Sequence, residues 1–247
     1  MNFKYQWFFL GIFILILPID AFSDESYDDE YEDELQTIES LDEKQAQATS
    51  DPFKPVNHAV FQFNDSLYFK VVKPVAKTYN KIVPKRVRIG LFNFFRNIKM
   101  PVRFLNCVFQ IKFIGASSEL TQFTINSTIG CLGFGKPAQT VFHLKPREED
   151  LGQTLGVYGI GNGIYIVWPI IGPTTLRDTI GSFGDTIFNP LSYITPWYIN
   201  GCVKGVDSLN SASLRIGEYE SLKQAAFEPY DAMKDAYIQY RHKKVAE

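Results

Sequence analysis

The chain has 247 residues and a formal net charge of −2, but its charges are divided unevenly along the sequence. Residues 24–50 hold eleven acids and one base, whereas the part from Asp51 onward holds 23 bases and 15 acids, a net charge of +8. Between Lys54 and Lys112 twelve Lys and Arg accompany one acid, Asp65, among many Phe and Tyr, which argues against an ordinary soluble domain. Aromatic side chains favour leaving water and a field of one sign attracts an anionic partner, so nucleic acid and anionic lipid are the partner classes to distinguish.

Residues 1–23 predict a secretory signal peptide. Lys4 precedes an apolar run from Trp7 to Leu17, and the small residues Ala21 and Ser23 are spaced for cleavage before residue 24. A membrane-spanning helix needs roughly 20 apolar residues, so this run is too short for an anchor. Export carries the chain away from cytosolic and nuclear nucleic acid, and we therefore expect a lipid partner and no nucleic acid.

Residues 24–50 predict a disordered acidic linker, because like charges repel one another and few apolar residues are available to offset the entropy of ordering. An alternative is that this segment folds back onto the basic part of the chain. The remaining residues, 51–247, are enough for one domain with its own core.

The first part of this domain predicts short helices that begin at prolines. Apolar residues recur at helical spacing after Pro74, Pro84 and Pro101, which predicts helices over residues 74–83, 84–98 and 101–109. The apolar stretches beyond residue 23 are too short to cross a bilayer, so a membrane-associated domain would lie in or on the membrane rather than span it as separate helices.

Residues 155–172 are rich in glycine, with aromatic residues between the glycines, and predict an extended or hairpin-like loop. Further helices are expected over residues 174–186, 202–216 and 229–243. The predicted fold class is therefore all-α with a glycine-rich loop.

The chemistry of an enzyme is not indicated by the sequence. The three histidines, His58, His143 and His242, are scattered, and no serine lies in a G-x-S-x-G nucleophile elbow. Metal-ligand spacing is missing around the three cysteines, and the glycine string at 159–163 lacks the Lys-Ser/Thr of a phosphate loop. We expect no catalytic residues, no metal site and no cofactor; the cysteines, Cys107, Cys131 and Cys202, are expected to be buried thiols or to include one disulfide pair.

Five segments of the predicted domain are informative together: DPFKPVNHAVFQFND from Asp51, KPVAKTYNKIVPKRVRIGLFNFFRNI, NSTIG, EDLGQTLGVYGIGNGIYIVWPIIGPTTLRD and EPYDAMKDAYIQYRH. They are collinear from Asp51 to about His242, which is almost the whole predicted domain. These segments resemble the MlaA (VacJ) family of outer-membrane phospholipid-transport proteins.

The resemblance implies a ring of short amphipathic helices in the periplasmic leaflet of the outer membrane, around a central amphipathic channel. It implies a non-enzymatic function, in which phospholipids misplaced in the outer leaflet pass through the channel to the periplasmic carrier MlaC and the lipid asymmetry of the membrane is maintained. A trimeric porin is the further partner that it implies. The alternatives are a porin-associated envelope scaffold without transfer activity and a lipid-hydrolysing envelope enzyme.

The resemblance also implies site residues. Arg177, Asp178 and Asp185, in LRDTIGSFGD, fall where the family places polar residues that face the channel, and Thr179 and Ser182 stand where family members carry more acids. The glycine-rich segment corresponds to a loop that would gate the channel; its glycines are Gly156, Gly159, Gly161 and Gly163.

One feature departs from the family pattern. Its members are typically lipoproteins, which carry acyl chains on a cysteine at the cleavage point, whereas the first cysteine of this sequence is Cys107. We expect attachment on the periplasmic side of the outer membrane through apolar side chains, the basic surface or the porin, because each Lys or Arg near an anionic surface contributes about 1 kcal/mol.

Overall fold

The computed structural model describes residues 49–247, so the predicted signal peptide (1–23) and nearly all of the predicted acidic linker (24–50) lie outside the described residues. Helices make up most of the described part. In chain order the elements are α3 (Lys54–Leu67), η2 (Tyr68–Val72), α4 (Lys73–Ile82), α5 (Lys85–Ile98), α6 (Met100–Phe109), α7 (Phe113–Thr128), α8 (Pro137–Thr140), α9 (Leu151–Val157), β1 (Tyr165–Trp168), β2 (Gly172–Thr175), α10 (Leu176–Phe188), η3 (Pro190–Tyr193), α11 (Trp197–Leu214), α12 (Glu218–Ala225) and α13 (Pro229–Ala246).

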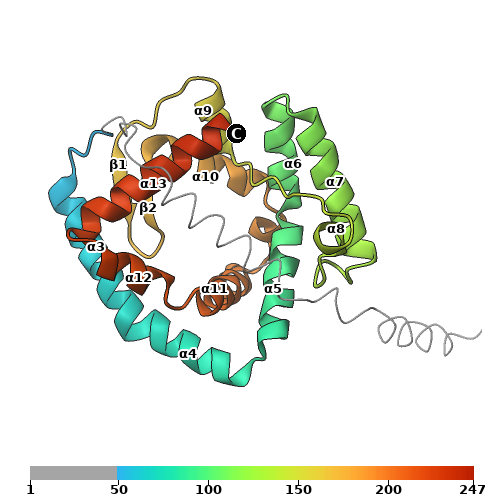
Figure 1. The fold of residues 1–247 in the computed structure, drawn as a ribbon, viewed down its shortest axis with the longest axis horizontal. Coiled ribbons are helices and arrows are strands. Elements are labelled where there is room, and N and C mark those ends of the chain that lie inside the picture. Colours follow the sequence, from blue (N-terminus) through green and yellow to red (C-terminus); the bar gives the residue numbers. More distant parts are fainter. Residues whose placement is uncertain (1–48) are drawn as a thin grey trace, which may run out of the picture.

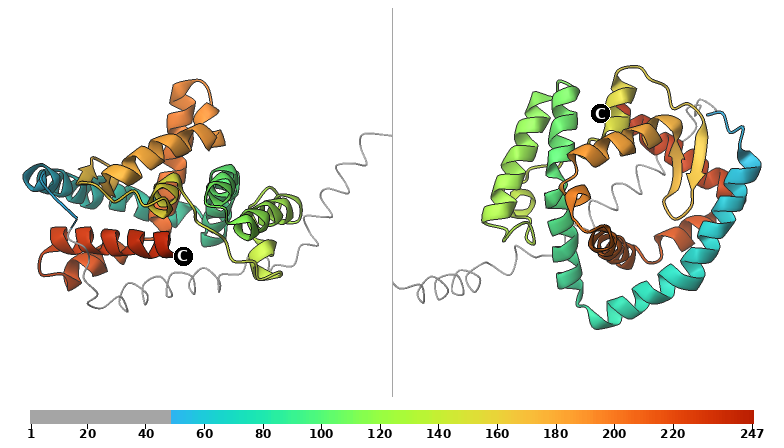
Figure 2. Two further views of the ribbon diagram at one scale, coloured as in Figure 1. Left: turned by 90° about the horizontal axis from the view of Figure 1, so that it is seen from above. Right: turned by 180° about the vertical axis from the view of Figure 1, so that it is seen from behind.

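The helices are arranged as a ring (Figure 1). One side of the ring is the arc of α3 and α4, the opposite side is formed by α5 and α6 with α7 and α8 outside them, and α9, α10 and α13 close the remaining side. Seen from the edge, the ring is a flattened body from which η3 and the adjoining end of α11 project on one face, while α12 and α13 lie on the other (Figure 2). The predicted ring-like helical fold is confirmed.

The helix starts follow simple sequence rules. Proline occupies a first-turn position of α3, α6, α8 and α13, where its missing N–H removes no helical hydrogen bond. Side-chain oxygens cap two other helices: Asp150 accepts from the N–H of Gln153 at the start of α9, and Thr175 accepts from the N–H of Asp178 at the start of α10.

The expectation that Pro74 begins a separate helix is only partly right. Residues 54–82 form one continuous helical run in which the π-helical segment η2 joins α3 to α4. Pro74 lies in the first turn of α4, directly after this widened turn, and its missing N–H is accommodated where the α-helical ladder is already interrupted. The run therefore bends and continues, which gives the arc seen in Figure 1.

The glycine-rich segment contains the predicted hairpin. Strands β1 and β2 pair in antiparallel fashion, with Tyr165 opposite Thr175 and Trp168 opposite Gly172. The helix expected to begin at residue 174 begins at Leu176, because the two threonines before it belong to β2. Helices α3, α7, α8, α9 and α12 were not predicted.

The hairpin is held by two asparagines of α3, spaced seven residues, or two helical turns, apart. Asn57 donates to the carbonyl of Tyr165 (3.0 Å) and accepts from the N–H of Val167 (2.9 Å). Asn64 likewise donates to the carbonyl of Trp168 (3.0 Å) and accepts from the N–H of Ile170 (2.7 Å). Together they pair with backbone groups of β1 and of the turn after it, as a neighbouring strand would.

Candidate functional site

The distribution of polar and apolar side chains is unusual for a folded domain. Among the described residues 20 polar or charged residues are buried, against 12 apolar ones, while 33 large apolar residues are exposed. A protein surrounded by water buries most large apolar side chains in its interior, and extended exposed apolar surface marks contact with another apolar phase. The surface of this ring is suited to contact with lipid.

Helix α10 shows this arrangement most clearly. Four apolar residues at helical spacing form one stripe and are between 42% and 71% exposed: Leu176, Ile180, Phe183 and Ile187. The other face is buried and contains Arg177, Asp178 and Gly181. The apolar face of α10 is thus the free one, and its polar face is the packed one.

The buried face of α10 is joined to α9 and α13 by ion pairs. Arg241 of α13 contacts Asp178 through Nη2 (2.8 Å) and Nε (3.0 Å), and it contacts Asp150 at the start of α9 through Nη1 (2.6 Å) and Nη2 (2.8 Å). Tyr237 donates to Asp178 (2.8 Å), and Arg177 donates to it through Nε (3.1 Å). Burial by itself would raise the pKa of Asp178, but Arg241, Tyr237 and Arg177 outweigh it and hold this pKa below its ordinary value.

Close helix packing brings these groups together. A Cβ atom at Gly181 of α10 would overlap the backbone N of Gly152 in α9, and a Cβ atom at Gly152 would come within 2.5 Å of an Asp178 oxygen and 2.7 Å of Arg241 Nη2. Only glycine at both positions lets α9 and α10 approach this far.

The structure places Asp185 about two helical turns from Asp178, on the same contact between helices. Its carboxylate accepts from Asn106 Nδ2 of α6 (2.8 Å) and from the N–H of Leu151, the first residue of α9 (3.0 Å). Burial raises the pKa of Asp185 above its ordinary value, while these two donors act against that shift. Of the residues expected from the sequence, Arg177, Asp178 and Asp185 therefore lie together along the packed face of α10.

Sequence reasoning missed the groups that surround Asp178. Tyr237 and Arg241, which donate to it, and Asp150, which Arg241 also contacts, belong to the quoted segments EDLGQTLG and EPYDAMKDAYIQYRH, but nothing in the sequence places those segments beside LRD. Asn106, which donates to Asp185, was missed as well. The detectable signal was Asp150 itself, because Asp is among the residues preferred at a helix N-cap.

An apolar pocket of about 350 Å³ lies near the tip of the hairpin. Its walls come from α3, η2, the hairpin, α12 and α13, and its apolar lining includes Phe61, Leu67, Val72, Val167, Ile170, Ile171 and Met233. At its rim Asp65 accepts from Tyr219 (2.8 Å) and Lys223 (2.6 Å). The burial of Tyr219 and its bond to Asp65 raise the pKa of that hydroxyl.

The four predicted gating glycines lie at the other end of the hairpin. Gly156 is packed in α9, where a Cβ atom would come within 2.6 Å of Val245. Gly159 and Gly163 have positive φ angles, and a Cβ atom at Gly159 or Gly161 would meet nothing within 4 Å. This loop borders a second pocket, of about 470 Å³, which Arg177 and His242 also line.

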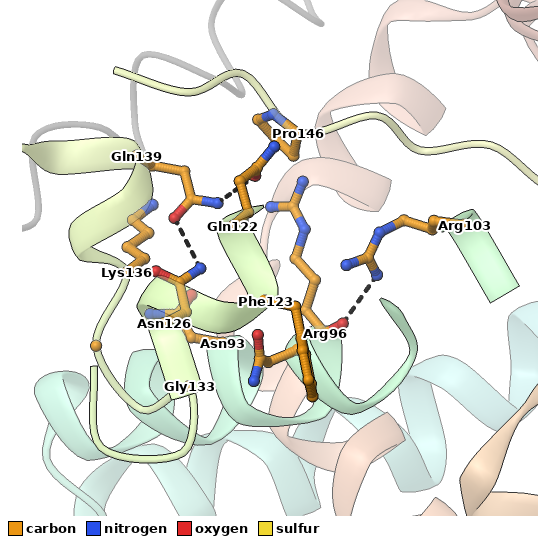
Figure 3. Close-up of a pocket in the computed structure, with 12 residues that line it drawn as sticks. Asn93, Arg96, Arg103, Gln122, Phe123, Asn126, Gly133, Lys136, Gln139 and Pro146 are labelled. Atoms are coloured by element: carbon orange, nitrogen blue, oxygen red, sulfur yellow. Dashed lines mark hydrogen bonds between the residues drawn. The ribbon is translucent and has the colours of Figure 1, made fainter. Parts of the chain in front are cut away.

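A third, small pocket of about 30 Å³ lies between α5, α7 and α8 and is surrounded by amides (Figure 3). Gln139 donates to Gln122 (2.7 Å), Asn126 donates to Gln139 (3.1 Å), and Arg103 donates to the carbonyl of Arg96 (2.8 Å). The space suits about one water molecule. We interpret this pocket as part of the polar interior.

The described residues include three free cysteines, with Cys107 buried and Cys202 exposed. Within residues 49–247 there is no group of three or more His, Cys, Asp and Glu side chains placed to hold a metal ion. None of the helices in that part of the chain has the length and apolar character to cross a membrane.

Comparison with known proteins gives consistent matches. The profile of the MlaA lipoprotein family matches residues 49–244. The intermembrane phospholipid transport system lipoproteins MlaA of Shigella flexneri and Escherichia coli K12 are each 32% identical to this chain over 209 residues, covering 81% of this chain and 80% of theirs. A structure solved under the description "structural basis for maintenance of bacterial outer membrane lipid asymmetry" matches with a TM-score of 0.71 and 29% identity, over 79% of this chain and 99% of that one.

Proposed function

The chain belongs to the MlaA lipoprotein family, and from this premise we propose that it acts without enzymatic chemistry in intermembrane phospholipid transport. It removes phospholipids misplaced in the outer leaflet of the outer membrane through a channel at the centre of the helical ring. It passes them to a periplasmic carrier, MlaC, and so maintains lipid asymmetry. No covalent bond is made or broken, so an apolar wall for acyl chains and a few polar groups for headgroups suffice.

The observation that carries this proposal is the orientation of α10. Its apolar stripe is exposed although its polar face is buried, the reverse of a helix that packs in water. Such a stripe is stable where acyl chains cover it. The apolar pocket beside the hairpin provides a second apolar surface on the same ring.

We assign roles to the predicted site residues on this basis. Arg177 has a guanidinium N–H without a partner among the described residues and borders the pocket beneath the glycine loop, which makes it the proposed contact for a lipid headgroup. Asp178 and Asp185 form the polar wall behind the apolar stripe and hold α10 in position.

The loop of residues 158–164 is the proposed gate. Gly159 and Gly163 adopt positive φ angles, and Gly161 has open space around it, so few side chains hold this stretch. Its contacts with α13 and α10 include those of Asn162, which lies 2.9 Å from His242 and accepts from the N–H of Arg177 (3.2 Å). Gly156, packed near the end of α9 against Val245, is the proposed start of the gate.

Anchoring is proposed to rely on the periplasmic leaflet and on a trimeric porin, after cleavage of the signal peptide. Exposed apolar residues continue along the arc of α3 and α4, among them Phe63, Phe69, Val75 and Ile82. Basic residues lie on the same arc, so apolar burial and attraction to anionic headgroups act together.

A pair of exposed phenylalanines tests the proposal. Phe183 lies on the α10 stripe and is 71% exposed, whereas Phe227, between α12 and α13, is 98% exposed and lies outside the stripe. In cells that depend on this chain, Phe183→Asn is expected to raise several-fold the amount of outer-leaflet phospholipid that is accessible to externally added phospholipase. Phe227→Asn is the matched control and is expected to leave that amount unchanged. Equal effects of the two variants at equal protein levels would contradict the assignment of the stripe.

A further inference from the structure

The pocket beneath the glycine loop has the features of a binding site. Its volume is about 470 Å³, and its walls come from residues 49–50, the loop, the start of α10 and the end of α13. Arg177 and His242 contribute basic groups, and among the described residues no acid lines this pocket. A cavity of this size, with basic groups in its wall, is suited to a small anionic group.

Arg177, which lines this pocket, has an unused donor. The side chain is 6% exposed; its Nε donates to Asp178 (3.1 Å) and its Nη1 to the carbonyl of Ile160 (3.4 Å). Within the part of the chain that the structure describes, its Nη2 is buried and has no hydrogen-bond partner. A charged donor buried in this way is costly, and a ligand oxygen at the pocket would satisfy it.

Asn162, which also lines the pocket, has an unused acceptor. Its Nδ2 lies 2.9 Å from His242 Nε2 and 3.4 Å from Thr49 Oγ1. Its Oδ1 is buried and lacks a partner in the described region. Two side chains that line the pocket therefore carry one unpartnered charged donor and one unpartnered acceptor, and a ligand that complements both carries an anion together with a hydrogen-bond donor.

We propose that this pocket is a subsite for a phosphate ester whose alcohol part carries a hydrogen-bond donor, as in ethanolamine or glycerol headgroups. A phosphate oxygen accepts from Arg177 Nη2, and the ammonium or hydroxyl group donates to Asn162 Oδ1. Guanidinium groups suit phosphate oxygens because the hydrogen bond is charge-assisted. The assignment to a phospholipid headgroup rests on the proposed function, and the apolar pocket at the other end of the same hairpin is the place for an acyl chain.

The test is a calorimetric titration of the full mature chain in phosphate-free detergent with phosphoethanolamine, phosphocholine and inorganic phosphate. Phosphoethanolamine is expected to bind about tenfold more tightly than phosphocholine, whose methylated nitrogen has no hydrogen to donate. Inorganic phosphate bound as tightly as phosphoethanolamine would overturn the headgroup assignment. No binding of any of the three compounds would overturn the subsite altogether.

Two variants locate the binding. Gly161→Asp places a carboxylate at the pocket, and since a Cβ atom there meets nothing within 4 Å, the fold is expected to tolerate it while phosphoethanolamine binding falls about tenfold. Gly201→Asp on α11, where a Cβ atom also meets nothing within 4 Å, is the matched control and should bind normally. Asn162→Ala should remove the preference for phosphoethanolamine over phosphocholine, a change in selectivity that a loss of folding would not produce. An unchanged preference in this variant would contradict the role of Asn162.

Phospholipid transfer to the carrier is measured on the same preparations. If the wild-type chain transfers phospholipid but does not bind phosphoethanolamine, the subsite is refuted and the proposed function stands. If phosphoethanolamine binds with the expected variant pattern but no lipid is transferred, the subsite stands and the proposed function is refuted.

Discussion

At the scale of single residues, the protein is organised around buried polar contacts. Arg241 is the central one, because its guanidinium joins Asp150 at the start of α9 to Asp178 on α10. Burial alone would lower the pKa of Arg241, but the two carboxylates raise it above its ordinary value, so this side chain stays charged. Its role is to keep two buried acids compensated.

Arg241→Gln is expected to destabilise the protein by about 3 kcal/mol, because removal of one partner leaves buried carboxylates uncompensated. The measurement is urea unfolding in detergent, monitored by circular dichroism. Lys244→Gln, one turn away, is the control: its contact with Glu247 is 3.4 Å long and partly exposed, and its loss should cost less than about 0.5 kcal/mol. Similar losses for both variants would show that Arg241 is not the central contact.

The residue scale also shows what the sequence could not predict. LRDTIGSFGD was identified as the site segment, and the structure gathers Arg177, Asp178 and Asp185 on one helix face. The partners of Asp178 and Asp185 come from residues 106, 151, 237 and 241, and local patterns do not specify which distant helix will bury which charge. That these three residues face a central channel stays a prediction.

At the scale of elements, α9 and α10 form the tightest helix pair near the site. Their approach depends on two glycines facing each other, Gly152 and Gly181. The helical spacing of apolar residues predicted α10, but α9 has seven residues and too few turns for such a pattern. The sequence therefore predicted one member of the pair and not the other.

Gly181→Ala is expected to destabilise the protein by about 2 kcal/mol, because the added methyl group overlaps the backbone of α9. Gly201→Ala on α11 adds the same methyl group in open space and should be neutral or stabilising by about 0.5–1 kcal/mol, since alanine favours helix. Thermal unfolding of the two variants side by side measures the difference. Two variants of equal stability would mean that α9 and α10 are not in close contact.

The hairpin is the second element-scale feature. Glycine and aromatic content predicted it, but not that α3 would hold its edge through Asn57 and Asn64, because side-chain to backbone bonds across more than 100 residues leave no local signal.

Asn64→Ala is expected to speed amide hydrogen exchange at Ile170 about tenfold, since that N–H loses its acceptor. The amide of Val167, held by Asn57, should exchange at its original rate. Asn64→Asp keeps an acceptor oxygen and should preserve the slow exchange of Ile170. Unchanged exchange at Ile170 in the alanine variant would show that α3 does not hold the hairpin tip.

At the scale of the whole molecule, the ring exposes many apolar side chains and buries amides and ion pairs. The sequence predicted the helical class from proline spacing and apolar periodicity, and the ring from resemblance to the MlaA family. It did not predict that Arg88 and Asn93 of α5 would be buried, where Arg88 donates to the carbonyl of Ser213 (3.1 Å) and Asn93 to that of Phe134 (3.3 Å). Periodicity identifies two faces of a helix, but the surrounding medium decides which face is buried.

The central claim is that the ring passes intact phospholipid to a carrier. The most direct measurement is mass-spectrometric lipid analysis of the detergent-purified chain and of its periplasmic carrier, before and after the two are incubated together. The account predicts intact phospholipid on the purified chain before incubation and on the carrier afterwards. Lysophospholipid or free fatty acid would instead indicate hydrolysis, and a chain that retains its porin but neither carries nor transfers lipid would be a scaffold; either result would contradict the account.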